Sequence, residues 1–203
     1  MDSGQIAEFL QAIKDHPFEA LFIVDLFTGL RQGEILGLTW DCVQGSTLYI
    51  YRQLQLIKGV YQLVTLKNDK TRRITPAPFI MRLLQAQKRK QAEWQLKAGT
   101  AWLNDDGFVF TDELGRHLAR QTVYQCFKRI VAALGIPDVR FHDMRHSYAV
   151  ASLQSGDDVK TLQENLGHHT AAFTLDKYGH VTERMKKESA ARMDNYIRSV
   201  TTG

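Results

Sequence analysis

The chain has 203 residues, of which 44% are hydrophobic, enough for one domain with a real core. Its formal net charge of +4 permits a polyanionic partner such as nucleic acid without requiring one. The two cysteines, Cys42 and Cys126, form no CxxC or other metal-binding spacing, which indicates a reduced, intracellular protein. The longest apolar run, 20–30, is interrupted by Asp25 and is too short to span a membrane.

Helical periodicity dominates the first part of the chain. Apolar residues from Ile6 to Ile13 recur at helical spacing and predict an amphipathic helix near 3–15. A second helix, apolar on most faces and therefore buried, starts after Pro17 and ends at Gly29. A short helix follows in "RQGEILGL".

The middle of the chain changes to the pattern of strands. Three segments rich in β-branched and aromatic residues, 46–54, 59–66 and 71–78, are separated by "LIKG" and "KNDK". They predict a three-stranded antiparallel meander. Helices return afterwards, so the pattern as a whole indicates one mostly helical α+β domain with a small sheet. The later predicted helices span 79–98, 119–134, 142–155, 158–166, 171–178 and 182–199.

The stretch "FHDMRHSYA" places His142 and Arg145 three residues apart, on one face near the start of a helix. The free N–H groups and the positive dipole of a helix start favour a bound phosphate. His146 lies one turn from His142, so the two histidines also have a spacing that can bind zinc. Arg145 beside the ion and the lack of an obvious third ligand argue against zinc. Read alone, the stretch also fits a plain helix surface.

Two further stretches carry polar residues in notable places. Arg31 follows a helix-ending glycine among apolar neighbours, where an unpaired guanidinium is unfavourable. An anionic ligand or a salt bridge to Glu34 would each satisfy it. Downstream, His168 directly follows a glycine that ends a predicted helix, and Tyr178 lies ten residues later. A tyrosine in such a place is usually a half-buried aromatic residue.

Taken in order, "TGLRQGEILGL", "HDMRH", "LGH" and "DKYGHV" closely resemble the signature of the tyrosine recombinases, the phage- and transposon-integrase family. The resemblance spans about 6–196 and implies the α+β, mostly helical catalytic-domain fold of DNA breaking-rejoining enzymes, with a three-stranded antiparallel sheet at one edge. Family members normally carry N-terminal DNA-binding domains. Nothing here matches one, so we expect a catalytic domain over 1–203 that is a truncated form of a longer protein.

The resemblance also implies a role for each matching residue. Arg31 and Arg145 would clamp the scissile phosphate, and the histidines would donate further hydrogen bonds to it. His142 is in addition the candidate acceptor of the tyrosine proton, and Glu34 would orient Arg31 through an ion pair. Tyr178 would be the nucleophile. The implied catalytic set is Arg31, Lys67, His142, Arg145, His168 and Tyr178.

The hairpin lysine of the family has two candidates in "LKNDKTRRITP". The family's usual hairpin pattern favours Lys67 as the acid that protonates the leaving 5′-oxygen, with Lys70 as a turn charge near the DNA backbone. No metal or other cofactor is expected, because the arginines would neutralise the charge that Mg²⁺ neutralises in other phosphoryl-transfer enzymes.

The implied function is site-specific recombination of double-stranded DNA at attachment sites, which integrates or excises a phage or mobile element. The protein would be cytoplasmic, bacterial or phage-encoded, and would act as a homotetramer on DNA, or as a monomer when the domain is isolated. The stretch 182–200 would dock on a neighbouring subunit or cap its own domain. Two alternatives stay open: an enzyme resembling type IB topoisomerases, and a DNA-binding module that has lost catalysis.

Overall fold

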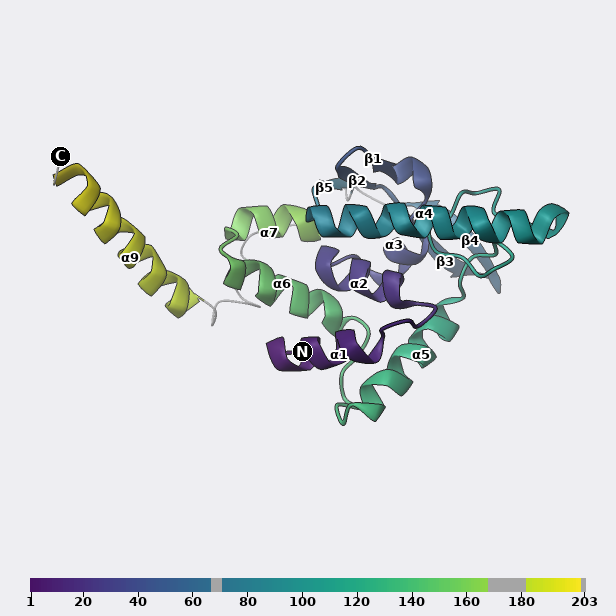
Figure 1. The fold of residues 1–203 in the computed structure, drawn as a ribbon, viewed down its shortest axis with the longest axis horizontal. Helices are drawn as coiled ribbons and strands as arrows, with labels where there is room; N and C mark the ends of the chain where they lie inside the picture. The colour runs from purple at the N-terminus through teal and green to yellow at the C-terminus, as the bar shows by residue number, and fades with distance from the viewer. Residues whose placement is uncertain (67–70, 168–181, 202–203) are drawn as a thin grey trace. The chain divides into compact units, whose positions relative to one another are not determined.

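The computed structural model describes residues 1–66, 71–167 and 182–201, whose helices and strands are labelled in Figure 1. The chain divides into two compact parts, Met1–Tyr148 and Ala149–Gly203. No helix among these residues combines the length and the apolar character needed to cross a lipid bilayer. The predicted helix at 171–178 lies outside the described residues.

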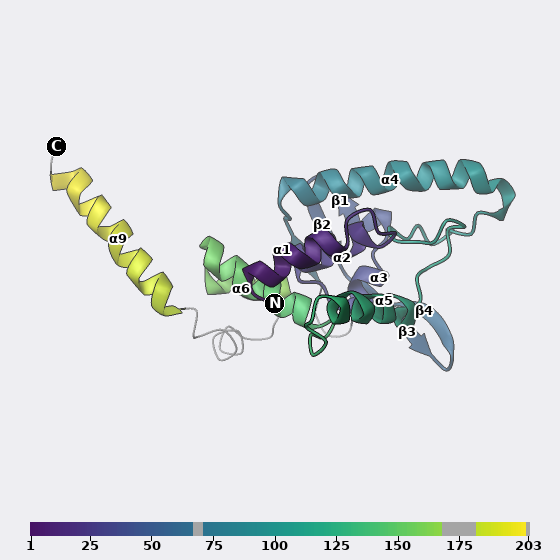
Figure 2. The same cartoon turned by 60° about the horizontal axis from the view of Figure 1, so that its bottom comes forward.

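The first part is built on helices that enclose an aromatic core. The rings of Phe9, Phe22, Phe127 and Phe141 contact one another with centroids 5.4–6.3 Å apart, and the first three are completely buried. Figure 2 shows the long helix α4 (Pro78–Ala98) running alongside α2 (Glu19–Thr28). The predicted helices are confirmed to within a few residues. The observed helices are α1 (Ser3–Ala12), α2 (Glu19–Thr28), α3 (Gln32–Leu36), α4 (Pro78–Ala98) and α5 (Arg120–Ala133), with 3₁₀ turns at Trp40–Cys42 and Gly99–Ala101.

The predicted meander is wrong, because the strands form two separate antiparallel sheets. The first predicted strand breaks at Tyr51, so that its halves belong to different sheets. A small three-stranded sheet is still present, in the order β1-β2-β5, beside a two-stranded β3–β4 hairpin. The strands are β1 (Val43–Gln44), β2 (Thr47–Ile50), β3 (Arg52–Ile57), β4 (Val60–Thr65) and β5 (Arg72–Ile74).

Side-chain burial explains this division of the strands. Leu48 of β2 lies opposite Ile74 of β5, and both side chains are buried in the core. In the hairpin, whose two strands are fully described, only Leu54 is buried. The hairpin closes through Lys58 and Gly59, both at positive φ (49° and 82°), the backbone geometry of a tight two-residue turn. The predicted turn at "LIKG" is therefore confirmed.

Helix α3 lies directly against β3 because glycines occupy the contact positions. A Cβ on Gly37 would lie 2.5 Å from the Leu54 nitrogen and 2.7 Å from the Gln53 carbonyl carbon. A Cβ on Gly33 would lie 3.2 Å from the Leu54 oxygen. This close contact fixes the β3–β4 hairpin beside α3.

Helix α6 (Asp143–Ser155) contains the boundary between the two parts, and the second part continues with α7 (Val159–Leu166) and α9 (Thr182–Thr201). The Asp158 side chain caps α7 by accepting the backbone N–H groups of the next turn at 2.8 and 2.9 Å. Gly167 ends α7 at a φ of 62°. The helices predicted at 142–155, 158–166 and 182–199 are confirmed.

We expect Gly37→Ala to destabilise the protein by about 1–3 kcal/mol, because the added methyl group overlaps the Leu54 backbone. Urea unfolding measures the change. Gly4→Ala in α1 is the matched control, since a Cβ there comes no closer than 3.4 Å to the Asp2 carboxylate. The control should be neutral or slightly stabilising. Equal stability of the two variants would contradict the close contact.

Candidate active site

The site is organised by a short turn between α2 and α3. Gly29 ends α2 in the left-handed conformation, with φ 62° and ψ 30°, and its N–H donates to the Asp25 carbonyl at 3.0 Å. Arg31 follows two residues later as the N-cap of α3, with extended backbone (φ −78°, ψ 151°). The stretch "TGLR" therefore holds Arg31 on a rigid link between two helices.

The Glu34 carboxylate is buried and accepts four hydrogen bonds from two arginines. Its Oε1 accepts from Nη1 of Arg31 at 2.6 Å and from Nη1 of Arg72 at 3.1 Å. Its Oε2 accepts from the Arg31 backbone N–H at 2.9 Å and from Nη2 of Arg72 at 2.7 Å. A carboxylate offers about four acceptor positions, so Glu34 is saturated. The Arg31 side chain remains 33% exposed.

The two arginines keep Glu34 ionised. Burial alone would raise the pKa of Glu34, but the hydrogen bonds and charge of Arg72, together with those of Arg31, outweigh it and lower the pKa to about 2. One negative charge therefore faces two positive charges at neutral pH. The group as a whole stays cationic, which suits a phosphate ligand.

Helix α6 brings the second predicted arginine to the same turn. Arg145 is only 3% exposed, and its Nη1 donates to the Gly29 carbonyl at 2.5 Å. Because Gly29 lies two residues before Arg31, one short stretch of backbone holds both predicted clamp arginines. His142 directly precedes α6, and its ring meets that of His146 edge-to-face at a centroid distance of 4.9 Å.

His142 is biased towards its neutral form. Desolvation lowers the pKa of its imidazole below the usual 6.5, and the positive charge of Arg145 lowers it further. Arg140 and Arg31 act in the same direction, whereas the negative charge of Asp143 opposes them. A neutral imidazole at physiological pH can accept a proton.

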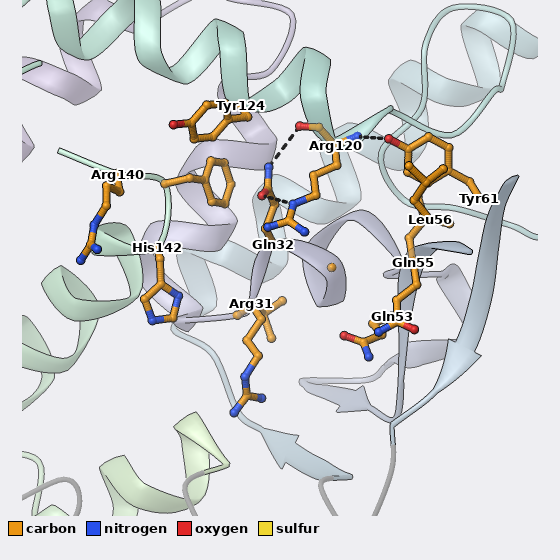
Figure 3. A pocket seen from close by; sticks show the side chains of 14 residues that line it. Arg31, Gln32, Gln53, Gln55, Leu56, Tyr61, Arg120, Tyr124, Arg140 and His142 are labelled. Atoms are coloured by element: carbon orange, nitrogen blue, oxygen red, sulfur yellow. Dashed lines mark hydrogen bonds between the residues drawn. The ribbon is translucent and has the colours of Figure 1, made fainter. Parts of the chain in front are cut away.

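A cavity of about 630 Å³ opens beside Arg31 and His142 (Figure 3). The β3–β4 hairpin and the N-terminus of α5 also line it, and none of its described lining residues is acidic. A second cavity, of about 440 Å³, shares Arg31 with the first and is also lined by Leu66, the last described residue before Lys67.

The structure thus places Arg31, His142 and Arg145 around one turn. The other three predicted catalytic residues, Lys67, His168 and Tyr178, lie outside the described residues, as does Lys70. Within the ranges 1–66, 71–167 and 182–201, no three His, Cys, Asp or Glu side chains are grouped as a metal site would require.

Arg72 is a site residue that the sequence patterns did not identify. The signal was available, because alternate residues of a strand face the same way. Ile74 of β5 is apolar and buried, so Arg72 two positions earlier also points inward, with a side chain 5% exposed. An inward-facing arginine needs a carboxylate partner, and Glu34 supplies it.

Asp25 is a second residue whose place was not foreseen. It is 1% exposed, and its Oδ1 has no hydrogen-bond partner among the described residues. Burial raises the pKa of Asp25 well above its usual value, the charge of Arg145 opposes the rise, and the charge of Glu34 adds to it. The clamp is therefore backed by a carboxyl group whose burial costs free energy once it ionises.

We expect Asp25→Asn to stabilise the protein more at pH 8 than at pH 5. The raised folded-state pKa means that wild-type Asp25 contributes stability when protonated, below its unfolded-state pKa, and that this contribution is lost as pH rises through the folded-state pKa. The amide that replaces the carboxyl group is neutral at every pH, so the variant does not lose this stability as pH rises. Urea unfolding at both pH values measures the difference, and an identical effect at the two would contradict the assignment.

Glu34→Gln is the matched control, and we expect it to change the free energy of unfolding in the opposite direction. The folded-state pKa of about 2 lies below the unfolded one, so wild-type Glu34 contributes stability above pH 4.5 that is lost as pH falls towards 2. Its replacement should cost roughly 3 kcal/mol at neutral pH and less in acid.

Comparison with known proteins identifies the family of the chain. The model of the phage integrase family matches residues 1–185. A XerC-like tyrosine recombinase of Caldanaerobacter subterraneus subsp. tengcongensis is 32% identical over 205 residues, covering 94% of this chain and 52% of the relative. The ICEBs1 integrase of Bacillus subtilis is 28% identical over 186 residues, covering 89% of this chain and 49% of the relative. The chain thus spans about half the length of these curated relatives.

Solved structures share the fold. A variant of the Tn1549 transposon integrase, in complex with transposon right-end DNA, superposes with a TM-score of 0.78 at 22% identity, covering 96% of this chain and 65% of that one. The XerA recombinase superposes with a TM-score of 0.70 at 18% identity, covering 93% and 64%. These likenesses confirm the expected catalytic-domain fold. The chain belongs to the phage integrase family of tyrosine recombinases.

Proposed function

We propose that residues 1–203 form the catalytic domain of a site-specific recombinase, which cuts and rejoins double-stranded DNA through a 3′-phosphotyrosyl intermediate. The observation that carries this proposal is the turn from Gly29 to Arg31. Arg31 lies at the end of this turn, and Arg145 donates to the Gly29 carbonyl at its start. His142 lies beside them and is biased to the neutral form. Family membership supports the same activity.

The two arginines suit the charge of a phosphodiester under attack. Each guanidinium is planar and offers paired N–H donors that match two phosphate oxygens. Arg145 is buried, and Glu34 fixes Arg31 before any ligand arrives. Donors fixed in advance and aimed at developing charge lower a barrier by about 3–4 kcal/mol each.

Strand cleavage then needs a nucleophile, a base and an acid. The Tyr178 oxygen attacks phosphorus and forms the new P–O bond, while its proton passes to the neutral imidazole of His142. The bond to the 5′-oxygen breaks, and Lys67 gives that oxygen a proton. His168 donates a hydrogen bond to the phosphate. One ester bond replaces another, so the step consumes no ATP and runs in reverse to reseal the strand.

The partner in this proposal is double-stranded DNA, and the working form is a homotetramer on two DNA sites. The Tn1549 integrase was solved with transposon DNA, which supports DNA as the ligand here. The tetramer rests on the family resemblance. Helix α9 carries an exposed apolar face that a subunit contact would bury, formed by Met193, Tyr196, Ile197 and Val200.

We expect Tyr178→Phe to abolish the covalent protein–DNA band that the wild-type chain forms with a nicked duplex carrying its attachment site. The variant lacks the attacking oxygen but keeps the arginines that bind the phosphate. Denaturing gels measure the adduct. Tyr124→Phe is the matched control, because Tyr124 lines the cavity beside Arg31 and His142 and should leave the band intact. A band that survives in Tyr178→Phe would show that Tyr178 is not the nucleophile.

The same substrates separate the alternatives. A wild-type chain that binds the duplex without any covalent band would favour a binding module. Relaxation of supercoiled plasmid regardless of site would favour the topoisomerase-like activity.

We expect Lys67→Ala to slow cleavage by about 100-fold or more, the usual contribution of a general acid. A 5′-thiol leaving group should restore the rate of this variant, since a thiolate leaves without needing a proton. Lys70→Ala is the control and should show neither the defect nor the rescue. Rescue of Lys70→Ala instead of Lys67→Ala would exchange the two roles.

A further inference from the structure

The cavity beside Arg31 holds one arginine whose charge no described carboxylate balances. Among the residues that the structure describes, three arginines and no acidic residue line this cavity. Arg31 and Arg140 are each ion-paired with the carboxylate three positions further along the chain. Arg120 is instead hydrogen-bonded to the neutral side chain of Gln32.

Arg120 is held in place by reciprocal hydrogen bonds. Its Nε donates to Oε1 of Gln32 at 2.9 Å, and Nε2 of Gln32 donates to the Arg120 carbonyl at 3.2 Å. The Arg120 backbone N–H donates to the Tyr61 hydroxyl of the β3–β4 hairpin at 3.1 Å. Figure 3 shows the guanidinium turned towards Gln32. This arrangement occupies Nε and leaves both Nη groups without a partner among the described residues.

The surrounding backbone adds to the positive charge. Arg120 is the first residue of α5, whose positive dipole end therefore lies at the cavity. The N-cap residue, Ala119, offers no side-chain acceptor, and the first turn contains no acidic residue. Together with the fixed guanidinium, this makes the α5 end of the cavity electropositive.

We propose that Arg120 binds a second DNA phosphate, near the one clamped by Arg31 and Arg145, and so sets the path of the strand across the cavity. This inference rests on the proposed function, which supplies the DNA. Gln32 follows Arg31 directly in the chain, so Arg120 is tied to the same short helix that begins beside the clamp. Its two Nη groups present the fork that matches two phosphate oxygens. Arg120 is a positioning residue and does not touch the reacting atoms.

The test is the salt dependence of DNA binding by Arg120→Gln. Each phosphate contact lowers log K by about 0.9 per unit of log salt concentration, so the slope should fall by about 0.9 in this variant. Affinity should fall about tenfold, as for the loss of one charge-assisted hydrogen bond. Fluorescence anisotropy with short duplexes of several sequences measures both, in a Tyr178→Phe background that keeps binding reversible.

Two further variants sharpen the result. Arg116→Gln is the matched control, because Arg116 is an exposed arginine ion-paired to Asp112 and does not line this cavity. Its slope should equal that of the parent. Gln32→Ala keeps the charge of Arg120 but removes its anchor, so affinity should fall while the slope is kept.

An unchanged slope in Arg120→Gln would overturn the phosphate contact. A loss confined to particular base sequences would overturn it as well, in favour of base recognition. If the chain with Tyr178 intact binds DNA but forms no covalent adduct, the recombinase proposal fails while a reduced slope still establishes the Arg120 contact. If that chain binds no DNA at all, both proposals fail.

Discussion

The buried carboxylate of Glu34 is the interaction on which the rest of the site depends. It saturates its acceptor positions with one arginine three residues away and another from a strand 38 residues further along the chain. Without it, two guanidinium groups would lose this negative charge beside them, and one of the two is nearly inaccessible to water. Because one group serves both arginines, the energetic contributions of Arg31 and Arg72 are coupled and cannot be added.

Helix α3 is stabilised by its contacts with neighbouring elements. A helix of five residues is too short to be stable in isolation, so tertiary contacts must hold it. Glu34 ties it to β5, and Gly33 and Gly37 press it against β3. Gln32 ties it to the start of α5. Arg31, the β3–β4 hairpin and the start of α5 are therefore all positioned by contacts with the short helix α3.

Local chemistry was predictable from the sequence, and pairings between distant segments were not. Helical periodicity and the glycine at 29 located the helices and the Arg31 turn, because these depend on neighbouring residues. The ion pair between Arg31 and Glu34 spans three residues and was expected. The strand pattern of 46–74 fits several pairings equally well, so the partner of β5 was missed, and Arg72 with it. Arg120 and Gln32 are 88 residues apart, and no local pattern connects them.

The aromatic core has a consequence for how the protein would respond to heat. Phe141 is buried against Phe22 and Phe127, and His142 is the next residue in the chain. The ring cluster thus sets the backbone position of the proposed proton acceptor. Because the same rings pack the helices of the first part together, warming that loosens them would displace the imidazole and unfold that part in one transition. Thermal inactivation would then coincide with thermal unfolding.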